Sequence, residues 1–430
     1  MSERPLRVGL IGCGTVGAAV VRLLDEHRED VARRAGGALE VVRVAVRDPG
    51  RDRGVALPKD AFTDDPMAVA TASDVDLVCE LMGGIEPARA LVLAALGAGR
   101  PVVTANKELV ASHGEELFHA ADAAGRDLLF EAAVGGGIPL IRPLKESLSG
   151  ERVTRVLGIV NGTTNYILTR MTEEGTGFAE ALAEAQRLGY AEADPAADVG
   201  GHDAAAKCAI LASIAFNARV VAADVHREGI ADLMADDIAM ARRLGYVVKL
   251  LAIAEAGADG RISVRVHPAL VPTDHPLASV RDALNAVYVE GPNIGELMFS
   301  GRGAGGAATA TAVVGDLVAA ARNLRAGTHG VGCTCFHETR IRPMGETEGQ
   351  YAIALLVRDR PGALAEIAAV FGDHGVSIRS AWQEGVGEDA RLEFVTHRAR
   401  EADFQAAVAG LRGLAAVREV RSVLRVEAEE

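Results

Sequence analysis

Aromatic residues and cysteines are scarce in this chain of 430 residues, which has 4% aromatic residues, one tryptophan and five cysteines. The cysteines are odd in number and widely scattered, so they match no disulfide framework and favour a reducing compartment. No uninterrupted apolar run is long enough to cross a bilayer. These absences predict a soluble, cytoplasmic protein that does not bind a membrane.

Basic residues are outnumbered, with 45 Lys and Arg against 59 Asp and Glu, and the net charge is -14. This balance excludes a broad surface for nucleic acid or anionic lipid. An anionic ligand would have to be bound locally, by a few cations or by helix N-termini. The length exceeds what one hydrophobic core supports, and it predicts two or three domains.

The N-terminal third alternates between short apolar strands and amphipathic helices. Strands are expected at 6–11, 39–46, 76–81, 101–104 and 128–131, and helices at 15–24, 87–96 and 107–124. This alternation predicts an α/β domain with a Rossmann-like, doubly wound parallel sheet over residues 1–134, to which a helix at 305–325 returns.

The pattern changes after the glycines at 135–137. Helices are expected at 165–174, 178–188, 203–217 and 231–244, and strands at 152–160, 247–254, 262–268 and 286–291. We expect residues 135–325 to form an α+β domain with a mainly antiparallel sheet, which binds substrate and carries the catalytic residues. Its Gly- and Ala-rich surround would offer an apolar face for assembly into a homodimer or tetramer.

The C-terminal part begins with a turn-rich linker over residues 326–349. Residues 350–430 then restart the pattern as β-α-β-β-α-β, which predicts a separate small domain of ferredoxin-like fold. Many functions use this fold, so the pattern alone assigns none to it.

A glycine motif follows the first strand and opens the first helix. Gly12 suits the tight turn, Gly14 lets a pyrophosphate approach the backbone, and Gly17 allows the helix to pack closely on the strand. The helix N-terminus would then face the phosphates. A glycine-rich turn without a ligand is the alternative, but the β-α-β context favours a dinucleotide.

The end of the second strand bears on the choice of cofactor. An acid there binds the ribose diol of NAD(H), whereas an arginine can pair with the 2′-phosphate of NADP(H). Arg47 takes the first position and Asp48 the next, and Lys59 is a possible second cation. NADP(H) is therefore favoured and NAD(H) stays possible, although a solvated surface arginine explains Arg47 nearly as well.

Two lysines stand out in positions suited to chemistry. Lys107 begins a helix at the carboxyl edge of the parallel sheet, where such folds bind ligands, although most lysines are merely solvated. Lys207 lies four residues after Asp203 in an otherwise apolar helix. The spacing fits a surface ion pair as well as it fits a lysine that a carboxylate holds as proton donor to a carbonyl.

Three segments closely resemble homoserine dehydrogenases: EAAVGGGIP at 131–139, GIVNGTTNYIL at 158–168, and the loop and helix at 189–207. The resemblance covers about residues 5–330. It implies reversible reduction of L-aspartate 4-semialdehyde to L-homoserine with NAD(P)H, in the branch that leads to threonine, methionine and isoleucine. Two departures are small: Ala196 replaces a frequent threonine and Gly200 a frequent acid.

The resemblance also implies roles for individual residues. Lys207 would relay the proton, with Lys107 beside the reacting oxygen and Asp203 orienting Lys207. The substrate would be bound by Gly189, Tyr190, Glu192, Asp198 and Lys107. The cofactor would be bound by Gly12, Cys13, Gly14, Thr15, Val16, Gly17, Arg47, Lys59, Thr104, Asn106, Lys107 and Gly303. A monovalent cation, Na⁺ or K⁺, would be held mainly by the main-chain carbonyls of Glu131, Val134, Gly136 and Ile138.

The turn Asp359-Arg360-Pro361-Gly362 and the helix after it are similar to ACT domains, which bind amino acids. The similarity implies feedback inhibition by L-threonine as effector, with Asp359 and Gly362 at its site. An assembly domain without ligand is the alternative. For the whole chain, the alternatives are an aspartate-type amino-acid dehydrogenase of the same fold and a non-catalytic amino-acid sensor.

Overall fold

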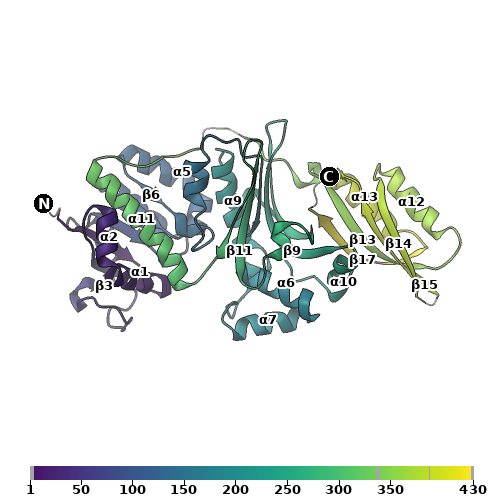
Figure 1. Cartoon of the computed structure of the whole chain (residues 1–430), viewed down its shortest axis with the longest axis horizontal. Coiled ribbons are helices and arrows are strands. Elements are labelled where there is room, and N and C mark those ends of the chain that lie inside the picture. The colour runs from purple at the N-terminus through teal and green to yellow at the C-terminus, as the bar shows by residue number, and fades with distance from the viewer. Residues whose placement is uncertain (1–3, 336–338, 387, 428–430) are drawn as a thin grey trace. The chain divides into compact units, whose positions relative to one another are not determined.

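The computed structural model describes residues 4–335, 339–386 and 388–427 (Figure 1). It divides into two compact units. The first unit comprises Met1–Val156, Ala206–Val225 and Asn285–Thr339, and the second comprises Leu157–Ala205, His226–Leu284 and Arg340–Glu430. Within the described ranges, every helix is too short or too polar to cross a membrane.

A six-stranded sheet in the order β3-β2-β1-β4-β5-β6 forms the centre of the first unit, and its neighbouring strands are all parallel. This confirms the Rossmann-like fold predicted from the alternation. The strands are β1 (Leu6–Ile11), β2 (Leu39–Ala45), β3 (Phe62–Thr63), β4 (Leu77–Glu80), β5 (Val102–Thr104) and β6 (Leu128–Leu129).

Helices cover both faces of this sheet, because successive side chains of each buried strand point to opposite sides. Leu10 joins a core with α1 (Thr15–Glu26), α2 (Arg28–Ala35) and α11 (Gly306–Ala326), and α11 lies beside α1 (Figure 1). Its neighbour Ile11 joins the core on the opposite face. That face carries α3 (Pro66–Thr71), α4 (Ala88–Gly97) and α5 (Lys107–Ala124).

The second unit is built on a mixed sheet, with strands in the order β7-β9-β10-β17-β13-β15-β14. The long strands β9 (Tyr246–Ala256) and β10 (Ile262–Pro272) pair antiparallel along their whole length, and β8 (His226–Arg227) pairs parallel to β10. The remaining elements outside the C-terminal module are β7 (Arg155–Ile159), α6 (Gly162–Glu174), α7 (Phe178–Arg187), α8 (Ala196–Val199) and α10 (Ala235–Arg243).

Three further elements complete this part of the chain. Helix α9 (His202–Ala215) crosses the boundary between the units after Ala205. Strands β11 (Leu284–Gly291) and β12 (Gly295–Arg302) are neighbours and fall almost wholly in the first unit.

The C-terminal module has the predicted β-α-β-β-α-β order. It comprises β13 (Glu348–Arg358), α12 (Ala363–Asp373), β14 (Ile378–Val386), β15 (Asp389–Thr396), the two-residue β16 (Ala399–Arg400), α13 (Glu401–Arg412) and β17 (Val417–Val426). Its core contains two aromatic pairs among aliphatic residues, with Tyr351 stacked on Phe404 at 3.9 Å between ring centres and Phe371 against Phe394 at 5.6 Å. The ferredoxin-like prediction is confirmed.

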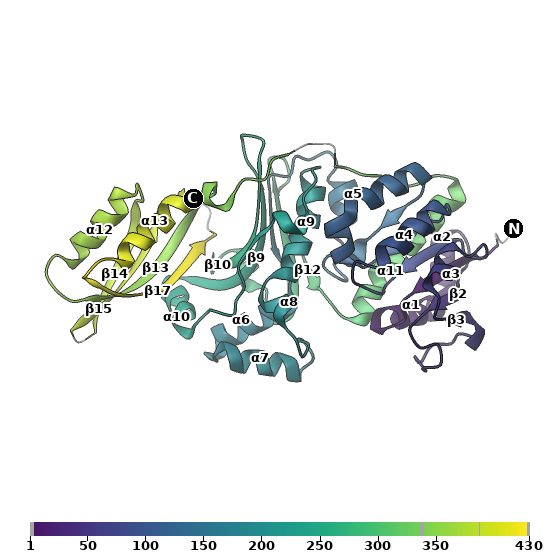
Figure 2. The same ribbon diagram turned by 180° about the vertical axis from the view of Figure 1, so that it is seen from behind.

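One feature of this module is not apparent from the sequence. Strand β17 pairs parallel with β10, through Ala269 opposite Arg425 and Leu270 opposite Val426 (Figure 2). The backbone N–H of Glu427 extends the pairing by donating to the carbonyl of Leu270 at 2.9 Å. The module is therefore joined by backbone hydrogen bonds to the sheet that carries β9 and β10.

Candidate active site

The turn between β1 and α1 has the geometry of a dinucleotide cradle. A Cβ atom at Gly17 would lie 2.3 Å from the carbonyl oxygen of Gly12, so only glycine allows the helix to pack this closely. A Cβ at Gly14, by contrast, would meet no atom within 4 Å. Helix α1 begins at Thr15, directly after Gly14, and a helix N-terminus beside an unfilled space suits a pyrophosphate.

The basic residues near this turn include the expected Arg47 and Lys59 and also Arg53, which was not expected. Arg47 and Lys59 are both exposed, while the carboxylate of Asp48 accepts a hydrogen bond from the backbone N–H of Gly50 at 3.0 Å. Arg53 donates to the carbonyl of Asp48 at 2.7 Å. Burial raises the pKa of the Cys13 thiol, and the positive charge of Arg53 opposes that rise, so this arginine acts on the glycine turn. Sequence reasoning missed Arg53.

Thr104 and Asn106 form a buried hydrogen-bond chain at the edge of the sheet. The fully buried carboxylate of Glu80 accepts a bond from the Thr104 hydroxyl at 2.6 Å, and also one from the backbone N–H of Met82 at 2.8 Å. Asn106 donates to the carbonyl of Gly84 at 2.6 Å and caps α5 by accepting from the N–H of Leu109. These side chains fix the loop over residues 80–84 against the helix that starts at half-buried Lys107.

Two acidic residues of the second unit meet on one asparagine. Asn161 follows β7, and its side-chain amide donates to Asp198 at 2.6 Å and to Asp203 at 2.9 Å. Its oxygen accepts from the backbone N–H of Thr164 at 2.8 Å and so caps α6. Only 5% of Asn161 is exposed. A neutral amide thus holds two carboxylates near each other, and sequence reasoning assigned Asn161 no role.

Lys207 lies one helical turn beyond Asp203 on α9 and is half-buried. The spacing of four residues puts both side chains on the same face of the helix. The other residues expected to bind substrate lie nearer the surface. Glu192 is exposed, and Tyr190 is 47% exposed, with its ring 4.9 Å from that of Tyr166.

The turn expected to hold a cation is tightly closed. The N–H of Ile138 donates to the carbonyl of Gly135 at 2.9 Å, and Gly136 has a left-handed backbone. The carboxylate of Glu131 accepts from the backbone N–H groups of Leu140 and Ile141, which ties the start of this turn to the residues that follow it. Among the described residues, no group of three or more His, Cys, Asp or Glu side chains could hold a metal ion.

In the first unit, Gly303 lies close to this turn. A Cβ at Gly136 would be 2.5 Å from the carbonyl oxygen of Gly303, and one at Gly303 would overlap the side-chain amide of Asn285. In the C-terminal module, Asp359 and Gly362 are both exposed at the turn between β13 and α12.

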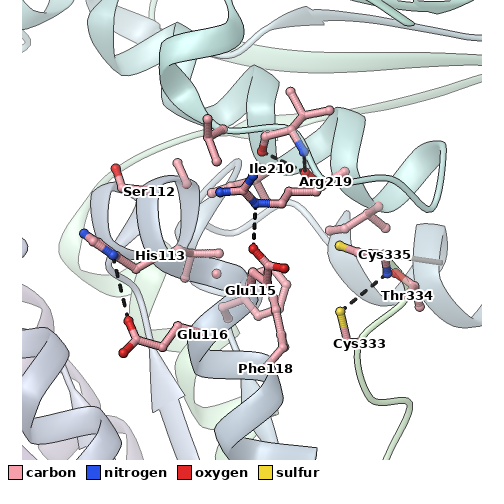
Figure 3. Close-up of a pocket in the computed structure, with 18 of the residues that line it drawn as sticks. Ser112, His113, Glu115, Glu116, Phe118, Ile210, Arg219, Cys333, Thr334 and Cys335 are labelled. Carbon is pink, nitrogen blue, oxygen red and sulfur yellow. Dashed lines mark hydrogen bonds and ion pairs between the residues drawn. The ribbon is translucent and has the colours of Figure 1, made fainter. Parts of the chain in front are cut away.

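A separate cavity of about 150 Å³ lies in the first unit between α5 and α9 (Figure 3). Its charged groups are paired: Arg219 with Glu115 at 2.7 Å, and Lys145 with the carbonyls of Val331 and Gly332. None of the site residues predicted from the sequence is among its described lining residues. We therefore assign no part of the active site to this cavity.

A glycine cradle on a parallel sheet, with the buried chain of Thr104 and Asn106 at the sheet edge, is typical of an NAD(P)-dependent oxidoreductase. Family models agree in order along the chain: the NAD-binding domain of homoserine dehydrogenase matches residues 12–131, homoserine dehydrogenase itself 139–318, and the ACT domain 351–415.

Similar proteins cover nearly the whole chain. A homoserine dehydrogenase from Corynebacterium glutamicum is 50% identical, over 98% of this chain and 95% of its own, and one from Bacillus subtilis is 43% identical, over 99% of both. The crystal structure of a homoserine dehydrogenase from Thiobacillus denitrificans is 40% identical, with a TM-score of 0.92 over 99% of both chains. The chain belongs to the homoserine dehydrogenase family, and its C-terminal module is an ACT domain.

Proposed function

We propose that this homoserine dehydrogenase uses Lys207 as its proton relay, with Asp203 as the group that orients it. The observation that carries the proposal is the Asn161 amide, which bonds Asp203 at 2.9 Å, one helical turn before Lys207. This bond fixes the carboxylate on the side of α9 from which it can direct a lysine.

In this proposal each site residue has its own role in the reaction. When bound, a reduced nicotinamide would supply the hydride that the aldehyde carbon accepts. The Lys207 ammonium donates a proton to the aldehyde oxygen, and in the reverse direction its amine accepts the proton of the homoserine hydroxyl. Lys107 lies beside this oxygen. Asp198 and Glu192 bind the substrate ammonium, and Gly189 and Tyr190 shape the pocket.

We propose NADP(H) as the preferred cofactor. Supporting this choice, Asp48 uses its carboxylate in its own turn, while Arg47 and Lys59 are exposed cations and Arg53 acts on the glycine turn. A solved archaeal homoserine dehydrogenase in complex with NADPH is 27% identical, over 74% of this chain and 98% of its own, with a TM-score of 0.62. In this proposal Cys13, Thr15, Val16, Thr104, Asn106 and Gly303 complete the cofactor site.

A monovalent cation, Na⁺ or K⁺, would bind the main-chain carbonyls of Glu131, Val134, Gly136 and Ile138. The closed turn with left-handed Gly135 and Gly136 supports this, because such turns bring successive carbonyls together. Its chemistry would be structural, stabilising the loop beside Gly303.

We propose that residues 1–134, with the helix at 305–325, bind the cofactor. Residues 135–325 bind the substrate and assemble the enzyme as a dimer or tetramer, and residues 350–430 regulate it. L-Threonine would bind near Asp359 and Gly362 and inhibit the enzyme in the cytoplasm. Replacement Asp359→Ala should then weaken threonine inhibition without changing turnover in its absence. Unaltered inhibition would remove this turn from the effector site.

The direct test is consumption of NADPH by the purified protein. It should depend on L-aspartate 4-semialdehyde, and the product should be L-homoserine. NADPH consumption with oxaloacetate and ammonia instead would identify an aspartate-type dehydrogenase, and no turnover with either substrate would favour a sensor.

A further inference from the structure

Among the side chains that join the ACT domain to the rest of the second unit, Arg425 makes contacts on both sides. Arg425 on β17 donates hydrogen bonds from both terminal nitrogens to the carboxylate of Glu228, each at 2.8 Å. It also donates to the carboxylate of Glu401 at 2.8 and 2.9 Å. Glu401 is buried and also accepts from the hydroxyl of Tyr351 at 3.0 Å. Arg425 is thus clamped between a residue of its own domain and Glu228, which follows β8.

The pair is ionised at neutral pH. Burial would raise the pKa of Glu228, but hydrogen bonds from His226 and Arg425 outweigh it and hold that pKa well below its usual range. The side chain of Arg425 is only 14% exposed, whereas that of Glu228 is 41% exposed, so the ion pair lies at the edge of the buried region.

The backbone after Glu228 touches the proposed substrate loop. The N–H of Ile230 donates to the carbonyl of Val199 at 2.8 Å. A Cβ at Gly229 would lie 2.3 Å from that carbonyl oxygen, so the close contact of the two segments requires glycine here. Val199 ends α8 and directly follows Asp198, whose carboxylate accepts from Asn161. Direct contacts therefore run from Arg425 to Asp198.

We propose that Glu228 is a positioning residue for the substrate loop, and that Arg425 of the ACT domain holds it in place, so that this domain supports the active site even without an effector. The inference rests on the proposed role of Asp198 in binding the substrate. A movement of β17 would reach the loop through the same contacts. Coupling of this kind is measured as an interaction between Glu228 and Arg425, beyond the sum of their separate effects.

The test is a double-mutant cycle on the full-length enzyme. Glu228→Gln and Arg425→Gln should each raise KM for homoserine by about tenfold, because a loop that is no longer held binds the ammonium poorly. KM for NADP and kcat should change less than about twofold. In the double variant, KM for homoserine should be no higher than in the single variant with the higher KM. Arg425→Lys should bring KM part of the way back to the wild-type value. Additive effects of the two single changes would overturn the proposal.

A matched control separates positioning from general anchoring. Arg243 on α10 forms another ion pair with the ACT domain, to buried Glu393 on β15, away from the substrate loop. Arg243→Gln should lower the melting temperature yet leave KM for homoserine within about twofold of the wild type. An equal rise in KM for Arg243→Gln would overturn the proposal in favour of simple anchoring.

A second reference variant, Asp198→Asn, separates the substrate-binding role of Asp198 from the positioning role of Glu228. Asp198→Asn should raise KM for homoserine more than Glu228→Gln does. If Asp198→Asn raises KM and Glu228→Gln does not, the substrate role of Asp198 stands and the positioning role of Glu228 is wrong. If Asp198→Asn has no effect, the substrate role fails, and the inference drawn from it fails as well.

Discussion

The cofactor turn and the carboxylate cluster are built by different means. The turn is local and made of backbone: within six residues, glycines either forbid a side chain or leave room for the ligand. The cluster is made of side chains that are distant in sequence, since Asn161 bonds partners 37 and 42 residues away. A substitution in the turn should therefore act through sterics, and one in the cluster through charge and hydrogen bonding.

The largest effect is expected at Lys207. Lys207→Ala should lower kcat by about a thousandfold, the usual contribution of a general acid, without weakening cofactor binding. Steady-state kinetics and titration of NADPH fluorescence measure the two quantities separately. Lys145→Ala, at a lysine bonded to the carbonyls of Val331 and Gly332, is the control and should keep most of the turnover. Turnover near the wild-type value in Lys207→Ala would remove this residue from the mechanism.

The steric side of the comparison can be tested with two alanines in the same turn. Gly17→Ala places a methyl group 2.3 Å from the carbonyl oxygen of Gly12, and it should cost about 1–3 kcal/mol of unfolding free energy as well as cofactor affinity. Gly14→Ala meets no protein atom within 4 Å, so it should keep the stability and weaken only the cofactor. Chemical denaturation and NADPH titration distinguish these outcomes. Equal loss of stability in both variants would contradict the open cradle.

The electrostatic side can be tested at Asn161. Asn161→Ser keeps a good helix cap but cannot bridge Asp198 and Asp203, so KM for homoserine should rise by about tenfold with little change in stability. Asn161→Ala also loses the cap of α6 and should cost about 1 kcal/mol more. Thr164→Val removes a neighbouring hydroxyl bond to Asn161 and serves as the control. If Asn161→Ser has normal kinetics, the amide bridge has no role in binding.

The smallest effect concerns the pH dependence of stability around α6. Lys249 is 4% exposed and bonds Asn165 on this helix at 3.0 Å, and burial lowers its pKa from 10.5 to about 8. Between these values the unfolded chain binds the proton that the folded protein has released, so Lys249 makes stability rise with pH there. The rise is at most about 1.4 kcal/mol per pH unit.

Lys249→Met should therefore remove part of this slope, which is measured by urea denaturation at several pH values from 8 to 10. The difference between the two proteins isolates Lys249 from the other titrating groups. An identical slope in both would show that Lys249 keeps its ordinary pKa in the folded protein.

The regular parts of the fold were predictable because their burial is periodic. Strands with two buried faces predicted the parallel sheet, and the C-terminal pattern predicted a ferredoxin-like fold. The ACT domain was recognised only from its resemblance at the turn 359–362 and the helix after it. Elements with little burial were not predicted. Helix α2 buries only Val31 and Ala35, and β12 has no buried residue, so neither leaves an apolar pattern in the sequence.

The site was predictable only where its signal is local. The glycine motif predicted the cradle. The positions of Thr104 and Asn106 at a strand end were recognisable from the sequence, but their hydrogen bonds to Glu80 and Gly84 were not. Arg53 and Asn161 depend on contacts that form only after folding. No short-range pattern distinguishes them from ordinary polar residues.

The pairing of β17 with β10 limits how this enzyme can be rebuilt. Exchanging the C-terminal domain for that of a relative would also exchange the partner of Ala269 and Leu270. A chimera with a mismatched register would leave part of β10 as an open edge, which invites aggregation. Domain exchange in this family should therefore transplant both strands together.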